Sequence, residues 1–224
     1  MKNLEDLNNT VVLSDFDGTI TTFDTNTRLF DRLAEREYIE KLRERYRNGE
    51  IDLKTLFNLH FSNVSLSEDQ YLDYILNEVE LQKGFKRFYN NLKDQNIPFS
   101  IVSGGFETGI KPFLKKHGFE EIPIYANKLI FDGDRVKVEY YDEEYLSHVI
   151  DEDHYVDCKV EILKDYRKRY DNIIFLGDGS TDIHVAEKVD ILFAKDYLEE
   201  YCIQKNIDYI GWEDFDDINE WFKK

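Results

Sequence analysis

The sequence predicts an α/β fold, a doubly wound, mainly parallel, Rossmann-like sheet with a small helical insertion after its first strand. Short apolar runs, rich in β-branched residues, each stop at a turn that carries Gly or Asp, as buried parallel strands do. Segments with helical periodicity separate these runs, and residues 22–80, after the first run, contain helical patterns only. The clearest runs are Val11–Leu13, Phe99–Val102 and Ile173–Leu176.

The composition is that of an acidic globular protein. The chain has 224 residues, of which 42% are hydrophobic, so it can form one large domain or a core with a small insert. Its net charge is −18, from 47 acidic and 29 basic residues. This charge argues against nucleic acid or an anionic membrane as a partner. We therefore expect an anionic substrate to be attracted only by local groups.

The cysteines and the N-terminus predict a cytoplasmic location. Cys158 and Cys202 are the only cysteines, no apolar signal region opens the chain, and no run is long enough to span a membrane. Cys158 precedes Lys159, but a reactive thiol there is a minor alternative. The aromatic tail at residues 212–222 either packs into the core or pairs with another subunit, which leaves the oligomeric state open.

Two carboxylates follow the first apolar run. Asp15 and Asp17 start on the same side of the strand because alternate residues share a face, and Gly18 lets the chain turn directly after them. Open α/β sheets place their sites at the carboxyl ends of such strands. We expect a divalent cation to offset the repulsion between these acids, the alternative being a solvated turn.

Residues 22–80 predict helices only. The first helical stretch begins at Thr25 or Asn26 and ends at Asn48–Gly49; a second begins after Asp52. A third follows Ser67, which has the spacing of a capping box. The length of the segment favours a separate cap over helices that cover a sheet face. We expect a core of residues 1–21 and 81–224 and a cap of residues 22–80.

The second apolar run, Phe99–Val102, is followed by Ser103–Gly104–Gly105–Phe106, which is expected to open a helix that runs to about Lys116. A hydroxyl group and free backbone N–H groups at a helix N-terminus can bind an oxyanion. Alone, this motif is also compatible with a plain tight turn. Residues 123–127 then predict a short strand, and residues 129–138 a hairpin.

The region before the last core strands contains one ambiguous segment and two candidate site segments. Residues 140–157 are acidic and include His148 and His154, and a solvated loop is favoured there over a second metal site. Lys159 begins a helix, where a cation opposes the dipole, which favours a functional role. Gly177–Asp182 follows the third run and adds acids at another carboxyl end.

These segments together resemble the four motifs of the haloacid dehalogenase superfamily of phosphohydrolases. They occur in the family order, and three of them directly follow a predicted strand. The motifs are Asp15–Ile20, Ser103–Gly105, Lys159 and Gly177–Asp182.

The resemblance implies a Mg²⁺-dependent phosphatase mechanism. Asp15 would be the nucleophile, and Asp17 the general acid and then the general base. Mg²⁺ would be held by Asp15, by the backbone carbonyl of Asp17, and by Asp178. Lys159 would offset the charge between Asp15 and the phosphate. Asp182 would orient either the surrounding loop or Lys159.

The resemblance also implies a substrate side of the site. Ser103 and the amide of Gly104 would bind the phosphoryl oxygens, next to Gly18 of the first motif. Asp24 matches an acid that phosphoserine phosphatases carry shortly after that motif. Those enzymes hold the substrate carboxylate with a cap arginine, but Lys54–Phe61, the matching segment, has none.

Within the superfamily, the sequence is most similar to methionine-salvage phosphatases that act on 2-hydroxy-3-keto-5-methylthiopentenyl-1-phosphate. Cys158–Lys159 and the segment from Phe193 to Phe215 carry that likeness, although the cysteine cluster of that family is missing before Cys158. Phosphoserine phosphatases are the nearest alternative, and phosphocholine and pyridoxal phosphate are other candidate substrates. A non-catalytic binding protein on the same fold is the alternative from another class.

Overall fold

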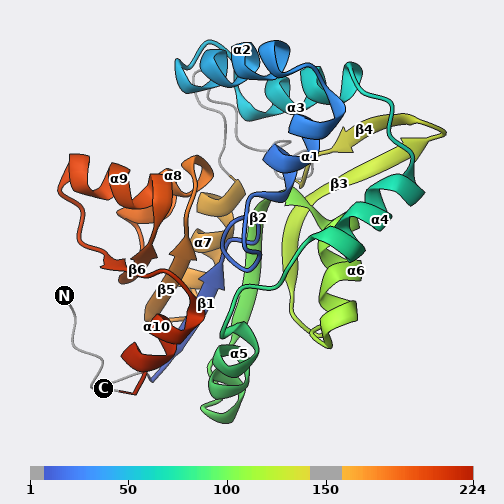
Figure 1. Ribbon diagram of the computed structural model, residues 1–224. Helices are drawn as coiled ribbons and strands as arrows, with labels where there is room; N and C mark the ends of the chain where they lie inside the picture. The colour runs from blue at the N-terminus through green and yellow to red at the C-terminus, as the bar shows by residue number, and fades with distance from the viewer. Residues whose placement is uncertain (1–7, 142–157, 224) are drawn as a thin grey trace.

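The computed structural model describes residues 8–141 and 158–223, and within them seven strands form one sheet. The strand order is β4-β3-β2-β1-β5-β6-β7, with β1 at the centre (Figure 1). Neighbouring strands are parallel except for the antiparallel pair β3–β4. This arrangement confirms the predicted doubly wound sheet. The strands are β1 (Thr10–Ser14), β2 (Phe99–Phe106), β3 (Ile124–Asp132), β4 (Arg135–Glu139), β5 (Asn172–Gly177), β6 (Ile191–Ala194) and β7 (Ile210–Gly211).

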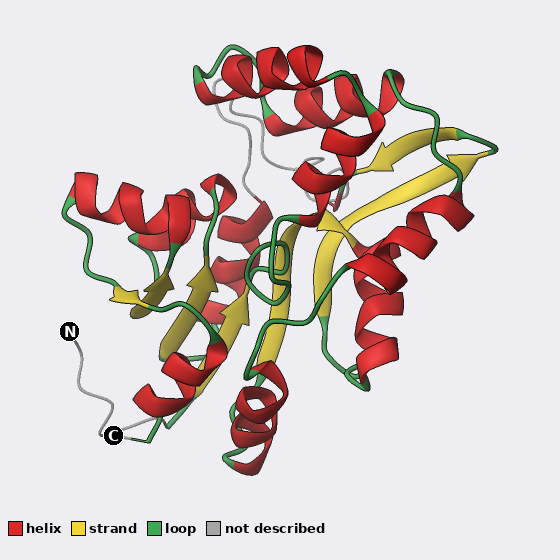
Figure 2. Cartoon of the chain, in the orientation of Figure 1, coloured by secondary structure: helices red, strands yellow, loops and turns green. Residues whose placement is uncertain are grey.

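Helices cover both faces of the sheet (Figure 2). Five of them surround the core strands, and α8 adds a short turn after a 3-10 turn at Ser180–Asp182. Helices α5, α6 and α10 pack on one face, and α7, α8 and α9 pack on the other. The helices are α5 (Phe85–Asp94), α6 (Glu107–His117), α7 (Cys158–Arg167), α8 (Ile183–Ala186), α9 (Asp196–Lys205) and α10 (Phe215–Trp221).

The central strand explains why the sheet is covered on both sides. Val12 packs into the cluster with α5 and α10, whereas Val11 and Leu13 pack into the cluster with α7. All three side chains are almost completely buried. A strand with apolar residues at every position can be stable only where both of its faces are covered.

The pairing of β1 brings three motifs to one edge of the sheet. Ser14 is paired with Ile101 of β2 and with Leu176 of β5. The N–H group of Asp15 then donates to the carbonyl oxygen of Leu176 at 2.9 Å. The residues that follow β1, β2 and β5 therefore leave the sheet side by side, at the edge where open α/β sheets carry their sites.

Four helices lie within residues 22–80, where the sequence predicts helices only. The first predicted stretch, from Thr25 to Asn48, is two helices, because the backbone becomes extended at Ala34 and Glu35. Arg43 of the second helix pairs with Asp31 of the first across this break. The helices are α1 (Thr25–Leu33), α2 (Arg36–Arg47), α3 (Leu53–Ser62) and α4 (Glu68–Glu78).

Of these helices, α3 packs against β4 of the β3–β4 hairpin, whereas α4 packs against α6 (Figure 1). The Ser65 hydroxyl group lies 2.7 Å from Asp134 Oδ2, and the N–H group of Leu66 donates to the Asp134 carbonyl oxygen at 2.9 Å. The Tyr140 hydroxyl group donates to the carbonyl oxygen of Lys54 at 2.9 Å. The hairpin thus supports the helical segment from the side of the sheet.

Two predicted boundaries differ from the structure. Strand β2 continues through Ser103–Gly105 to Phe106, and α6 begins only at Glu107. The Ser-Gly-Gly motif is therefore an irregular part of the strand, and the predicted helix begins after it, with Phe106 as its N-cap residue. Strand β3 also runs from the predicted short strand into the predicted hairpin without a break, because it pairs with β2 in its first half and with β4 in its second.

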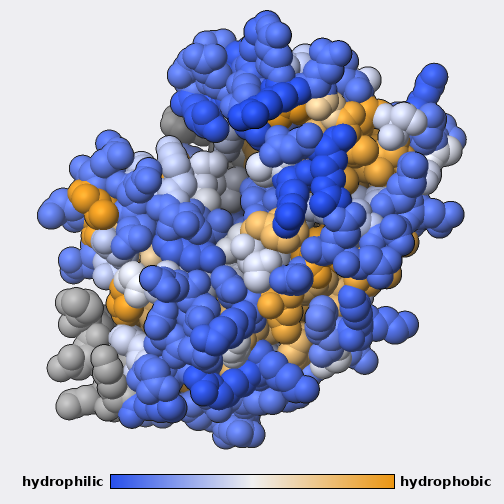
Figure 3. All heavy atoms as spheres, in the orientation of Figure 1, coloured by the Kyte–Doolittle hydropathy of each residue, from blue (hydrophilic) through white to orange (hydrophobic). Residues whose placement is uncertain are grey.

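The aromatic tail packs within the chain. Trp212, Phe215 and Ile218 are buried, and α10 lies against α5. Most of the surface in Figure 3 is hydrophilic, in keeping with the high content of charged residues. No helix among the described residues is long and apolar enough to cross a membrane. The predicted acidic loop with His148 and His154 lies outside the described residues.

Candidate active site

Asp15 and Lys159 meet at the carboxyl edge of the sheet. Asp15 directly follows β1, and Lys159 lies in the first turn of α7. The Lys159 ammonium group lies 3.1 Å from Asp15 Oδ1 and 2.6 Å from Asp182 Oδ1. Both partners and the lysine are almost fully buried, so this is a desolvated ion-pair network. Burial raises the pKa of Asp15, and the charge of Lys159 opposes that rise.

Asp182 connects the lysine to the loop after β5. Its Oδ1 accepts from Lys159, and its Oδ2 accepts from the backbone N–H groups of Asp178 and Gly179 at 3.1 and 3.0 Å. The two contacts that the sequence left as alternatives, to Lys159 and to the loop, are therefore both present. A Cβ atom at Gly177 would overlap the Asp182 carboxylate, so glycine is required for this approach.

Asp178 is held beside the first motif. Thr19 donates to Asp178 Oδ1 at 2.6 Å, and the other oxygen, Oδ2, lies against Gly18. Gly18 has a φ of +79°, and a Cβ atom there would overlap Asp178 Oδ2. Glycine at this position thus serves both the turn and the close approach of the second acid.

The acids form a cluster that fits a divalent cation. Carboxylate oxygens of Asp15, Asp178 and Asp182 all lie within 4.8 Å of one another. Burial and the charges of Asp15 and Asp182 raise the pKa of Asp178 well above its usual range. Both oxygens of Asp182 already accept hydrogen bonds, which leaves Asp15 and Asp178 as the side chains with capacity to ligate. Such hard oxygen donors suit Mg²⁺.

Asp17 has different neighbours, which come from the helical segment. The Thr25 hydroxyl group donates to its Oδ1, and Asn26 Nδ2 donates to its Oδ2 at 3.0 Å. A Cβ atom at Gly105 would overlap the same carboxylate, so Asp17 packs directly against the Ser-Gly-Gly turn. Burial and the charges of Asp24 and Asp15 raise the pKa of Asp17 to about 8. The side chains that donate to this carboxyl group from the described residues are therefore neutral.

Ser103 and Gly104 lie next to these acids in the irregular part of β2. Ser103 is buried, and its Oγ accepts from the N–H group of Gly105 at 3.0 Å. A Cβ atom at Gly104 would lie 3.5 Å from Thr181 Cγ2 and 3.6 Å from Leu53 Cδ2. The turn is thus flanked by the loop after β5 and by the first residue of α3.

Asp24 is the N-cap residue of α1. Its side chain accepts from the N–H group of Thr27 at 2.7 Å, and it is exposed. Its charge nevertheless contributes to the raised pKa of Asp17. A substrate-binding role of Asp24 stays a prediction.

Several residues of the site were not singled out as site residues from the sequence. The sequence identifies Thr25 and Asn26 only as candidate helix caps, although both donate to Asp17. Thr181 accepts from Lys159 at 3.1 Å, and Asn127 donates to the carbonyl oxygen of Gly104 at 2.9 Å. Asn127 offered one signal, because asparagine is disfavoured inside a strand. Leu53 offered no signal, because its contact depends on the tertiary structure.

Comparison with known proteins supports the predicted resemblance to phosphatases. The chain is 29% identical to a 2-hydroxy-3-keto-5-methylthiopentenyl-1-phosphate phosphatase of Bacillus pumilus, over 95% of this chain and 90% of that one. An enzyme of the same name from Exiguobacterium sibiricum is also 29% identical, over 92% and 93% of the two chains. Among solved structures, a phospho-aspartyl intermediate analogue of phosphoserine phosphatase matches the fold with a TM-score of 0.72, at 21% identity, over 94% of this chain and 97% of that one.

The sequence-family model of the haloacid dehalogenase-like hydrolases matches residues 12–187, which include all four motifs. The expectation of a phosphoric monoester hydrolase is confirmed, and the alternative of a non-catalytic binding protein loses its support. The chain belongs to the haloacid dehalogenase-like hydrolase family.

Proposed function

We propose that this phosphatase hydrolyses a small phosphate monoester through an aspartyl-phosphate on Asp15, with Mg²⁺ as cofactor. We further propose that its physiological substrate is of the 2-hydroxy-3-keto-5-methylthiopentenyl-1-phosphate type, the activity for which similar curated proteins are named. The observation that carries the mechanism is the convergence of Asp15, Asp178 and Lys159 at one edge of the sheet.

In the first step, Asp15 attacks the phosphorus atom and the ester P–O bond breaks. Lys159, 3.1 Å from Asp15 Oδ1, opposes the rise that burial causes in the pKa of Asp15 and so favours the ionised nucleophile, and it offsets charge on the incoming phosphoryl group. Asp17 gives its proton to the leaving alkoxide. A pKa of about 8 supports this role, because Asp17 then carries a proton near neutral pH.

In the second step, Asp17 takes a proton from the water that attacks the aspartyl-phosphate. Inorganic phosphate leaves, and the Asp15 carboxylate and the Asp17 carboxyl group are restored. Ser103 and the Gly104 amide hold the phosphoryl oxygens throughout. Asp15, Asp178 and the Asp17 carbonyl group would hold a Mg²⁺ ion, which would supply Lewis-acid stabilisation of the phosphoryl charge.

The neighbours of the turn support an uncharged substrate tail. The α3 residue that contacts the Gly104 position is Leu53, and Lys54–Phe61 contains no arginine. Phosphoserine would require a cation at this place to bind its carboxylate. The fold similarity to phosphoserine phosphatases keeps that activity as the second candidate.

We propose that residues 22–80 act as a cap domain over a core of residues 1–21 and 81–224. The hydrogen bonds from Thr25 and Asn26 to Asp17 support a link between this segment and the chemistry. The contact of Leu53 with the turn supports a role in substrate choice.

A panel of phosphate esters tests this function. Phosphate release is measured from 2-hydroxy-3-keto-5-methylthiopentenyl-1-phosphate, phosphoserine, phosphocholine and pyridoxal phosphate, with Mg²⁺ or with EDTA. We expect kcat/KM for the first ester to exceed that for phosphoserine by at least about tenfold. We also expect EDTA to remove the activity. An equal or higher value for phosphoserine would overturn the substrate assignment, and activity in EDTA would overturn the metal assignment.

The variant Leu53→Arg sharpens the test of substrate choice. It places a cation at the α3 position that contacts the turn, so the ratio of the two kcat/KM values should move toward phosphoserine by about tenfold. The matched control Thr55→Arg adds the same charge at an exposed α3 position, and its ratio should equal that of the wild type.

A further inference from the structure

The Ser-Gly-Gly turn has an irregular place in the sheet. Val102 of β2 pairs with Tyr125 of β3, and the next paired residues are Phe106 and Asn127. Ser103, Gly104 and Gly105 thus lie opposite a single residue of β3, Ala126. The extra residues of such a bulge lose regular ladder partners, so their backbone groups must be satisfied in another way.

The side chain of Asn127 supplies one of these partners. Its Nδ2 donates to the carbonyl oxygen of Gly104 at 2.9 Å, and its Oδ1 accepts from the N–H group of Tyr141 at 3.1 Å. The residue is 5% exposed. Asn127 therefore anchors the turn to the backbone at the end of the hairpin, and the anchor needs a donor and an acceptor on one short side chain.

The opposite end of the same peptide unit is also fixed. The N–H group of Gly105 donates to Ser103 Oγ at 3.0 Å. The Gly104–Gly105 peptide is thus held at its oxygen by Asn127 and at its nitrogen by Ser103. Because Ser103 Oγ accepts this bond, its own proton stays available for donation, and no acceptor for it is found among the described residues.

We infer that Asn127 is a positioning residue of the phosphoryl site. It fixes the Gly104–Gly105 peptide, and through it the Ser103 hydroxyl group, in the orientation that donates to the phosphoryl oxygens. This inference rests on the proposed function, in which Ser103 and Gly104 bind those oxygens. Donors that are oriented before the reaction stabilise the charge that develops in the transition state.

The test replaces the amide by groups that cannot hold the turn. Asn127→Asp keeps the shape and the acceptor but cannot donate to Gly104, and Asn127→Leu removes both functions. With p-nitrophenyl phosphate and Mg²⁺, we expect kcat to fall by at least about tenfold and KM to change by less than about threefold. Orthovanadate, which adopts a trigonal-bipyramidal geometry, should inhibit about tenfold less well, with little change for inorganic phosphate.

Asn219→Asp is the matched control. Asn219 is also a buried amide, and its Nδ2 donates to the carbonyl oxygens of Gly84 and Phe215, between α5 and α10. This variant should lower the thermal unfolding midpoint but leave the ratio of the vanadate and phosphate inhibition constants at the wild-type value. An equal change of that ratio in Asn219→Asp would overturn the inference, because it would show a general loss of packing.

A double variant gives a second measurement that does not depend on one substitution. If Asn127 acts through Ser103, then Ser103→Ala combined with Asn127→Leu should lose at most about threefold more kcat than Ser103→Ala alone. If the loss of kcat in the double variant equals the product of the losses in the two single variants, the inference is overturned. Wild-type kinetics in both Asn127 variants would also overturn it. A wild-type protein that hydrolyses no phosphate ester with Mg²⁺ would instead overturn the proposed function.

Discussion

Asp15 and Asp17 lie two residues apart after β1, but they have different partners. The partners of Asp15 lie at the carboxyl edge of the sheet, and those of Asp17 lie in the first turn of α1. Asp15 lies 3.1 Å from the ammonium group of Lys159. Asp17 accepts from the hydroxyl group of Thr25 and the amide of Asn26, which are neutral. Burial raises both pKa values, to about 7 for Asp15, where the charge of Lys159 opposes the rise, and to about 8 for Asp17, where the charges of Asp24 and Asp15 add to it. Environment, rather than residue type, thus separates a nucleophile from a general acid.

The largest effect should come from the sheet edge. Asp15→Asn removes the attacking carboxylate, so kcat for p-nitrophenyl phosphate and for an alkyl phosphate should both fall by at least about a thousandfold. Circular dichroism and the thermal unfolding midpoint should stay close to those of the wild type.

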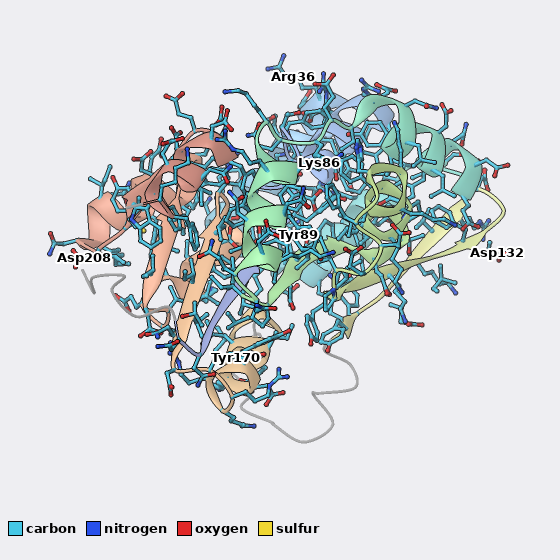
Figure 4. The ribbon with its side chains drawn as sticks, turned by 90° about the horizontal axis from the view of Figure 1, so that it is seen from below. Arg36, Lys86, Tyr89, Asp132, Tyr170 and Asp208 are labelled. Carbon is cyan, nitrogen blue, oxygen red and sulfur yellow. The ribbon has the colours of Figure 1, made fainter. Side chains whose placement is uncertain are left out.

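Asp208→Asn is the control for this change. Asp208 is exposed and lies at the periphery of the molecule in this view (Figure 4). It should keep wild-type kcat on both esters. Normal turnover in Asp15→Asn would show that another residue is the nucleophile.

Asp17→Asn should distinguish the two carboxyl groups. The p-nitrophenolate group leaves without a proton, so Asp15 can still be phosphorylated by that ester, but the later hydrolysis lacks its base. We expect a burst of at most one equivalent of p-nitrophenolate in rapid-mixing experiments, followed by turnover reduced about a hundredfold or more.

An alkyl phosphate should give no burst with Asp17→Asn, because its leaving group needs the proton of Asp17. A variant that turns over both esters at equal and normal rates would remove the distinction between the two regions. A variant that shows no burst with p-nitrophenyl phosphate would assign Asp17 to the first step for both esters.

A smaller effect is expected for the contact from α1. The Thr25 hydroxyl group donates to the Asp17 carboxylate and so lowers the pKa of Asp17. In Thr25→Val this donor is lost, and the pKa rises further above its usual range. The protonated general acid then persists to higher pH, so the alkaline limb of kcat/KM for an alkyl phosphate should move up by up to about one pH unit.

Thr27→Val is the matched control, because Thr27 lies in the same turn but is exposed. Its pH profile should coincide with that of the wild type. A shift of the alkaline limb to lower pH in Thr25→Val would contradict the direction of the hydrogen bond.

The fold was largely predictable because its strands are local patterns. Val11–Leu13 and Ile173–Leu176 are apolar at every position, and that pattern requires cover on both faces. The break between α1 and α2 was not predictable, since each half has helical periodicity and the extended residues at 34 and 35 are set by packing. The course of β2 through Ser103–Gly105 was missed for a similar reason: Asn127, which anchors that bulge, is remote in sequence.

The site was predictable where one motif supplies its own geometry. Asp15 and Gly18 belong to a single turn, so their proximity follows from the local sequence. The surroundings of Asp17 come from Thr25 and Asn26 in another element, and no local pattern states which side chains a carboxyl group meets there. The side chains that set the pKa of Asp17 reach it through tertiary contacts, and the sequence alone does not show such contacts.

The smallest expected effect concerns the stability of the helical segment. His60 of α3 is 4% exposed, packs on the ring of Phe30 at a centroid distance of 4.3 Å, and has no hydrogen-bond partner at either ring nitrogen among the described residues. Burial, with the charge of Arg43, lowers the pKa of His60 to about 4. An unfolded histidine has a pKa of about 6.5. Between these values the unfolded chain binds a proton that the folded chain does not, so acidification favours unfolding.

This difference should cost the wild type about 2 kcal/mol of unfolding free energy between pH 7 and pH 5. His60→Leu removes the proton-binding group, so its urea midpoint should fall less over the same interval, at constant ionic strength. His184→Leu replaces an exposed histidine and should keep the wild-type dependence on pH. Equal slopes for His60→Leu and the wild type would mean that His60 gains a proton in the folded helices, and the acid sensitivity would then belong to the buried carboxyl groups of the sheet edge.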